Sequence, residues 1–289
     1  MHGEQGGALY IVSSAPRILN NIIDLNSSGT FGEGCGIYIS SGTPLIEGNM
    51  ISDNHNGTDD DMGTIVVFGT ARILKNIIVN NSQDGIYSAG NASIINNTFS
   101  DNLGDGIYIS NQSGDSIVNN IISLNSGYGI REGGTSADPA IVWYNLFYTN
   151  GSGLYFDEGS TDYYDVGSLN SSVSECKNNI SGDPMFVNKT GNDYHLQSGS
   201  PAINAGNPDP QFNDPDYSRN DMGAYYLDTP PDVPQNINAV AGNNQISIIW
   251  NKNTEPDFRR YRIYGGTSPN PTIKTDSTNY FSDTARIIT

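Results

Sequence analysis

Residues 85–109 read GIYSAGNASIINNTFSDNLGDGIYI and contain one complete repeat and the start of the next. The repeat opens on Gly-Ile-Tyr at 85–87, and the same unit returns at 106–108. Apolar and polar residues alternate within each Gly unit, which is typical of short β-strands. A unit of this length cannot bury its apolar side alone, so successive copies must stack on one another.

Further copies of the Gly unit extend the pattern in both directions. The units at Gly85, Gly106, Gly129 and Gly153 are 21, 23 and 24 residues apart. Parallel strands stack ~4.8 Å apart, so coils of this length with two or three short strands each predict a parallel β-helix. Other copies occur at Ala8-Leu9-Tyr10-Ile11, Gly36-Ile37-Tyr38-Ile39 and, less clearly, from Gly63 to Val67.

Asparagine recurs at two places in each repeat, always five residues apart. Asn and Gly tolerate the left-handed backbone of tight corners. A buried amide is tolerated only when it is hydrogen bonded, so we expect the stacked asparagines to form structural ladders along the coils. The first ladder comprises Asn21, Asn49, Asn76, Asn97, Asn120 and Asn145, and the second comprises Asn26, Asn54, Asn81, Asn102, Asn125 and Asn150.

These repeats resemble the right-handed parallel β-helix proteins of the pectate-lyase-like superfamily. The resemblance covers about residues 6–183 and implies an all-β fold with a right-handed parallel β-helix over residues 1–183. It does not specify an activity, because that superfamily includes lyases, hydrolases, epimerases, adhesins and inert stalks.

The C-terminal third has a different pattern. Residues 184–228, with Ser200-Pro201-Ala202-Ile203 and Asp221-Met222-Gly223-Ala224, resemble the closing segment of secreted bacterial β-helix proteins. We expect this segment to cover the last coil and its strand edges. Residues 229–234 form a Pro-rich linker. Residues 235–289, with Trp250 and Tyr261, resemble an incomplete fibronectin type III β-sandwich, which needs ~100 residues.

Both ends of the sequence interrupt a pattern, so we expect the chain to be an excerpt of a longer extracellular or cell-surface protein. The net charge of −18 and the scattered Lys and Arg argue against nucleic-acid binding. No apolar run reaches the ~18 residues that predict a membrane span. Cys35 and Cys176 lie about five coils apart, too far for a disulfide, so both are predicted to be free thiols. The sequence leaves the oligomeric state open.

One tyrosine of each Gly unit lies between two inward-facing apolar residues and is therefore expected to face outward. Arg131 takes the same place in its coil, and Ile65 or Val66 takes it in the less clear copy. An exposed aromatic row can bind the sugar rings of a polysaccharide or cell-surface glycan. The sequence favours instead a self-packed stack, or Tyr chosen because it suits half-buried strands. The row comprises Tyr10, Tyr38, Tyr87, Tyr108 and Tyr155.

Two acidic stretches are candidate metal sites, with calcium as the candidate ion because it prefers oxygen ligands. The loops 27–35 and 55–62 leave adjacent coils at one corner, which would bring their acids near His55; such a carboxylate pair could also act as acid and base. Solvated loops and Asp-Pro turns are the favoured explanation of the two stretches. The candidate ligands in the loops are Glu33, Asp59, Asp60 and Asp61, and those in the stretch 214–221 are Asp214, Asp216 and Asp221.

Catalytic candidates are few. β-Elimination from a uronate needs a Lys or Arg base and a cation that neutralises the substrate carboxylate. Lys75 and Arg131 are the candidate bases, but a single cation is not a site. The polygalacturonase signatures N-T-D, D-D, G-H-G and R-I-K are absent as a set, with only Asp59-Asp60 supplying a D-D pair.

Three functions remain open: a non-catalytic module that contacts glycans, a polysaccharide lyase or glycoside hydrolase, and a purely structural spacer. The sequence favours the first without assigning a cofactor. A groove lined by two carboxylates, or by Lys or Arg beside calcium, would favour the enzyme. An open Tyr row parallel to the helix axis would favour the binding module, and a row covered by loops would favour the spacer.

Overall fold

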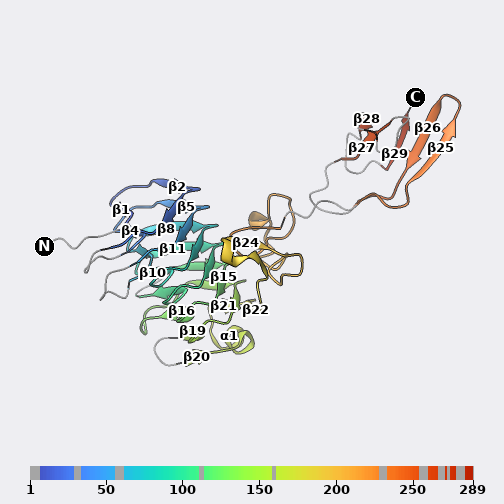
Figure 1. Cartoon of the computed structure of the whole chain (residues 1–289). Coiled ribbons are helices and arrows are strands. Elements are labelled where there is room, and N and C mark those ends of the chain that lie inside the picture. Colours follow the sequence, from blue (N-terminus) through green and yellow to red (C-terminus); the bar gives the residue numbers. More distant parts are fainter. Residues whose placement is uncertain are drawn as a thin grey trace. The chain divides into compact units, whose positions relative to one another are not determined.

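The computed structural model describes residues 7–28, 34–55, 62–110, 114–157, 161–227, 233–253, 260–265, 271, 274–277 and 284–288. The chain divides into two compact units. The larger unit contains residues up to 212 and residues 219–227, and it is the parallel β-helix (Figure 1). The smaller unit contains residues 213–218 and 228–289.

Three parallel sheets run along the β-helix, and each coil contributes one strand to each sheet. The first sheet comprises β1 (Leu9–Ile11), β4 (Ile37–Ile39), β7 (Ile65–Val67), β10 (Ile86–Ser88), β13 (Ile107–Ile109), β16 (Tyr128–Glu132), β19 (Gly153–Asp157) and the antiparallel β20 (Thr161–Tyr163). The second comprises β2 (Arg17–Leu19), β5 (Leu45–Glu47), β8 (Thr70–Leu74), β11 (Asn91–Ile95), β14 (Ser116–Val118), β17 (Ile141–Trp143) and β21 (Cys176–Lys177). The third comprises β3 (Ile22–Asp24), β6 (Met50–Ser52), β9 (Ile77–Val79), β12 (Thr98–Ser100), β15 (Ile121–Ser123), β18 (Leu146–Tyr148) and β22 (Ile180–Ser181).

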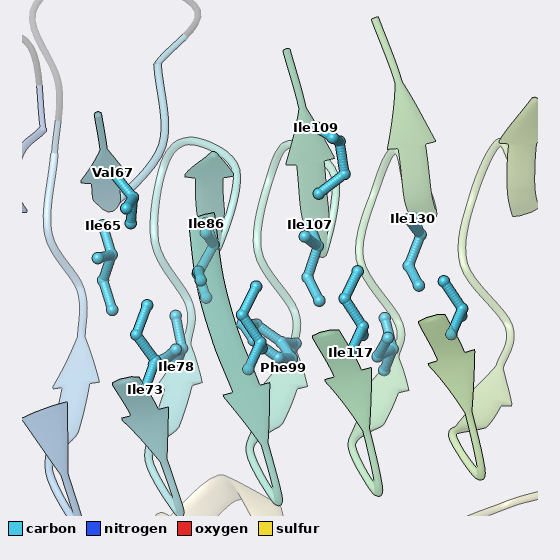
Figure 2. Packing of buried hydrophobic residues seen from close by; sticks show 14 of the residues in the cluster. Ile65, Val67, Ile73, Ile78, Ile86, Phe99, Ile107, Ile109, Ile117 and Ile130 are labelled. Atoms are coloured by element: carbon cyan, nitrogen blue, oxygen red, sulfur yellow. The ribbon is translucent and has the colours of Figure 1, made fainter. Parts of the chain in front are cut away.

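The core is a stack of aliphatic side chains between the three sheets, as the alternating pattern predicts (Figure 2). Ile86 and Ile107 of the first sheet and Ile94 of the second are fully buried. Each such isoleucine contributes about 2 kcal/mol of hydrophobic stabilisation. The glycine that opens each Gly unit is required for space, because a Cβ at Gly106 would lie 2.6 Å from the Gly129 carbonyl oxygen.

Both asparagine ladders are present in the structure. Asn97 Oδ1 accepts hydrogen bonds from the backbone N–H and the side-chain amide of Asn76, and Asn97 in turn donates to Asn120 Oδ1. The left-handed backbone lies one residue before each ladder asparagine, for example at Lys75 (φ 54°) and Tyr144 (φ 56°). The corner strain therefore falls on the neighbour, and the ladder residue keeps a backbone suited to lateral hydrogen bonding.

The helix α1 (Val166–Ser172) closes the C-terminal end of the β-helix. Asp165 caps α1 by accepting a hydrogen bond from the Ser168 N–H at 2.8 Å. Leu169 is fully buried in the main core, and Asn170 Oδ1 accepts hydrogen bonds from Asn179, so α1 also ends the first asparagine ladder. The helix thus supplies both the apolar and the polar partners that a further coil would give.

The segment after residue 183 packs along the third sheet of the β-helix, and not only over its last coil as predicted. It contains β23 (Phe186–Asn188), β24 (Asp193–Leu196) and the 3₁₀ turns η1 (Lys189–Gly191) and η2 (Pro210–Phe212). Tyr194 and Met222 pack on the outer side of the third sheet, and Lys189 Nζ lies 2.8 Å from Asp101 Oδ1. The segment packs on Leu146 and Ile180 of the last coils, where it was predicted, but it also extends along the outer face of the third sheet, and α1 closes the end of the core.

The smaller unit contains two antiparallel sheets, which is consistent with a β-sandwich. One sheet has the order β25 (Asn238–Gly242), β26 (Gln245–Ile249) and β29 (Ala285–Ile288), and the other pairs β27 (Arg262–Tyr264) with β28 (Lys274–Ser277). Trp250 packs against Tyr261 with ring centroids 4.8 Å apart. The assignment to the fibronectin type III family stays a prediction.

Cys35 and Cys176 are both free and buried, as their separation predicts. Burial raises the pKa of the Cys35 thiol to about 11 and raises that of Cys176 further. Both side chains are therefore neutral thiols at ordinary pH. Within the described residues, no helix combines the length and apolarity that a membrane-spanning helix needs.

Candidate functional site

The aromatic row of the first sheet forms along the helix axis, but Tyr38 is buried within it and Tyr155 lies outside it. Tyr10 pairs with Tyr38, Tyr87 with Tyr108, and Tyr108 with Arg131. Tyr155, however, pairs with Ile130 and is fully buried, while Phe156 pairs with Arg131. The prediction that Tyr155 faces outward was wrong, because its Gly unit is displaced by one residue relative to the preceding strand.

The buried Tyr155 donates its hydroxyl hydrogen bond to Glu132 Oε1, which is also fully buried. Burial and the Glu132 carboxylate raise the pKa of Tyr155 well above its ordinary value. Tyr155 therefore belongs to the core and supports no contact with a ligand.

The rings that remain in the row pack on one another. The centroids of Tyr87 and Tyr108 are 5.2 Å apart with planes at 13°, and those of Tyr10 and Tyr38 are 5.4 Å apart. Phe68, which the repeat pattern did not indicate, lies 5.6 Å from Tyr38 and 6.4 Å from Tyr87. Because neighbouring rings cover the ring faces, a ligand would meet ring edges and hydroxyl groups.

A groove of about 640 Å³ lies beside Tyr87 and Tyr108. Its polar lining includes the carboxylates of Asp84 and Asp105 and the Arg131 guanidinium. Residues at equivalent turns of successive coils line it, so the groove follows the helix axis. The remaining lining residues are Met62, Gln83, Leu103, Gly104, Gly127, Tyr128 and Ser152.

The two aspartates of the groove are fixed by the backbone of the following coil. Asp84 Oδ1 accepts the Asp105 N–H at 2.6 Å, and Asp105 Oδ1 accepts the Tyr128 N–H at 2.5 Å. Gly127 leaves room for this contact, because a Cβ there would lie 2.1 Å from Asp105 Oδ1. Both carboxylates are more than nine-tenths buried and hold fixed positions on the groove wall.

Among the described residues that line the groove, Arg131 is the one cation. Its Nη1 lies 3.8 Å from Asp105 Oδ2, and its guanidinium lies 5.4 Å from the Tyr108 ring centroid and 5.8 Å from that of Phe156. Burial raises the pKa of Asp105, against the opposing effects of the Tyr128 N–H and Arg131. The positive charge of Arg131 thus balances the charge of one of the two carboxylates, and the groove keeps a net negative charge.

Lys75, the other predicted base, is not in this groove. It is exposed at the corner between β8 and β9, whereas the groove lies at the first sheet. Lys75 and Arg131 therefore do not share a site.

In the described part of the chain, the predicted metal ligands do not form a group that could hold an ion. Glu33, Asp59, Asp60 and Asp61 lie outside the described residues, although their loops start from the paired positions Ser27 and His55. Asp216 accepts hydrogen bonds from Ser218, and Asp221 accepts the N–H groups of Asn204 and Leu227. Asp214 is buried. Asp216 thus takes part in a local turn, the alternative weighed from the sequence, whereas Asp221 links segments 17 and 6 residues away.

A different acidic group lies at the C-terminal end of the first sheet. Glu132, Asp138 and Glu175 place one carboxylate oxygen each within 4.8 Å of the others. Asp157 lies nearby, and burial together with Asp138 raises its pKa. These residues follow no repeat spacing, so no sequence signal marks them as a group.

The family comparison extends over most of the β-helix. Residues 1–199 match the family model described as Periplasmic copper-binding protein (NosD). The chain belongs to the NosD family. This membership agrees with the parallel β-helix fold and with a place in the cell envelope outside the cytoplasm, without indicating the cell surface. No curated protein matches the chain.

The described residues do not fit the copper centre that the NosD description suggests. Copper prefers imidazole, thiolate and thioether ligands. In the described part of the chain, the group of three that could hold a metal contains carboxylates alone and neither His nor Cys. His195 Nδ1 lies 2.7 Å from Asp193 and its ring stacks on Tyr225, while both cysteines are buried thiols.

The repeat pattern did contain a signal for the groove. Asp-Gly-Ile-Tyr occurs at 84–87 and again at 105–108, which places an acid on the same turn of consecutive coils. The tyrosine of this unit was predicted as a binding residue and the aspartate was not, because an Asp before Gly is also common in ordinary turns.

Proposed function

We propose that this NosD-family chain is a non-catalytic β-helix module outside the cytoplasm that binds a polysaccharide in the groove beside Tyr87 and Tyr108. The observation that carries the proposal is the groove itself, in which polar groups repeat along the axis at the coil spacing. That spacing of ~4.8 Å is close to the length of one pyranose unit in an extended chain.

The contacts would be made by hydroxyl groups and ring edges. Tyr87 donates its hydroxyl hydrogen bond to Ser110 Oγ at 2.6 Å, whereas the Tyr108 hydroxyl makes no hydrogen bond to any described residue. Leu103 is 67% exposed at the groove and offers an apolar surface to a sugar ring. This mixture of apolar surface and fixed polar groups is typical of ligand sites.

The test is native electrophoresis through gels that contain one polysaccharide each, with and without calcium. The wild-type chain should be retarded in at least one gel. The double substitution Tyr87→Ala/Tyr108→Ala should abolish retardation, and Tyr108→Phe should weaken it about threefold to tenfold, since one neutral hydrogen bond contributes about 1 kcal/mol.

Tyr164→Phe is the matched control, because Tyr164 is 68% exposed and lies outside the groove. Its retardation should equal that of the wild type. Circular dichroism of every variant separates loss of binding from loss of fold. Unchanged retardation of the folded double variant would contradict the proposal.

A second candidate is a glycoside hydrolase, which the pair of groove carboxylates favours. Hydrolysis of a glycosidic bond uses one carboxyl group as acid and another as base or nucleophile. Asp84 and Asp105 provide such a pair, and burial raises the pKa of Asp105 as an acid requires. Release of reducing ends from a retarded polymer, lost in Asp105→Asn, would establish this activity instead of simple binding.

A further inference from the structure

The charged groups that line the groove are Asp84, Asp105 and Arg131, so the groove has an excess of one negative charge. The whole chain carries a net charge of −18. Both charges disfavour the binding of a polyanion, because like charges brought together in a partly buried site repel each other strongly.

The single cation of the groove lining is already engaged. The Arg131 guanidinium faces Asp105 Oδ2 at 3.8 Å and lies between the rings of Tyr108 and Phe156. A uronate carboxylate that approached Arg131 would therefore also approach Asp105. The two aspartates cannot turn away, because each holds a backbone N–H of the next coil.

Carboxylates are hydrogen-bond acceptors without a proton to donate, and sugar hydroxyls are donors. Resting on the glycan-binding function proposed above, we infer that the groove selects a neutral, hydroxyl-rich polysaccharide and rejects polyuronates. Asp84 and Asp105 are the specificity-determining residues: they accept hydrogen bonds from hydroxyl groups and repel carboxylates.

Matched polymer pairs test this inference, since both members share one backbone and differ in charge. Suitable pairs are pectate with fully methyl-esterified pectin, and carboxymethylcellulose with hydroxyethylcellulose. Dissociation constants are measured for the full chain by affinity electrophoresis in calcium-free buffer at low and at high salt. In at least one pair, the neutral member should bind at least tenfold more tightly at low salt, and the difference should shrink at high salt.

Asp105→Asn and Asp84→Asn should each reduce the discrimination within that pair at least threefold, because an amide keeps the acceptor oxygen and removes the charge. Asp24→Asn makes the same change of net charge at an exposed position of β3 and should leave the discrimination unchanged. An equal effect of all three variants would mean that overall charge, and not the groove, rejects the anion.

Failure of the neutral-glycan inference and failure of polysaccharide binding would give different results. Equal binding of both members of every bound pair, or tighter binding of the charged members, would overturn the neutral-glycan inference and leave polysaccharide binding intact. Failure of every polymer to bind would overturn polysaccharide binding and, with it, the inference about charge.

Discussion

Asp115 shows, at the scale of a single residue, how the coil stack changes the chemistry of a side chain. Its carboxylate is fully buried, with one oxygen accepting the Ala92 N–H. Burial raises the pKa of Asp115 to about 6 from an ordinary 3.8, although the Ala92 N–H and the Ser88 hydroxyl oppose this shift. The folded chain therefore binds this proton more tightly than the unfolded chain does.

Asp115 therefore makes the fold less stable as the pH rises. The protonated Asp115 stabilises the fold fully below about pH 4, and this contribution is lost as the pH rises toward 6. Asp115→Asn should raise the free energy of unfolding by about 3 kcal/mol at pH 7.5 and have little effect at pH 4. Urea denaturation at both pH values measures the difference, with Asp24→Asn as the exposed control. A gain of equal size at both pH values would show that titration is not its cause.

The asparagine ladders act at the scale of the element, because each rung joins two coils. Asn120 Oδ1 accepts from the backbone and side chain of Asn97, and Asn120 donates to Asn145 Oδ1 and to the Ile94 carbonyl. Asn21 belongs to the same ladder, but it lies in the first coil and is exposed. The two positions therefore differ in burial and in the number of neighbouring rungs.

Asn120→Ala should lower the free energy of unfolding by about 3 kcal/mol, since it leaves several buried partners without hydrogen bonds. Asn21→Ala should cost less than about 1 kcal/mol, because water can replace its partners. Chemical denaturation of both variants measures the two costs. Equal costs would show that the ladder contributes through corner geometry and not through buried hydrogen bonds.

At the scale of the whole molecule, the two compact units carry one tryptophan each. Trp143 lies on β17 of the β-helix, and Trp250 follows β26 in the smaller unit. The strand β25 beside β26 is exposed along its whole length, whereas the β-helix has a continuous core. The smaller unit should therefore be the less stable one.

Single-tryptophan variants report each unit separately. Trp143→Phe leaves the signal of Trp250, and Trp250→Phe leaves that of Trp143. In urea, the Trp250 fluorescence should change at a lower midpoint than the Trp143 fluorescence, and the wild type should show both transitions. Coincident midpoints in the two variants would mean that the units unfold as one cooperative body.

The coils, their strands, the inward isoleucines and the asparagine ladders could all be predicted from the amino-acid sequence. Each of these depends on a spacing that repeats, and a stack of parallel strands converts equal spacing directly into equal position. The free state of Cys35 and Cys176 followed from the same geometry. The repeat unit also held Asp84 and Asp105, but only their position on adjacent coils shows that they share a groove.

The features that break the repeat could be seen only in the tertiary structure. A displacement of one residue buried Tyr155 and placed Phe156 in the aromatic row, because side chains alternate faces along a strand. The role of α1 as the end cover and the position of residues 184–227 on the third sheet depend on contacts between distant segments. The shape of the groove was also visible only in the tertiary structure, because Arg131 and Leu103 join the repeated Asp84 and Asp105 there from positions that the repeat does not mark.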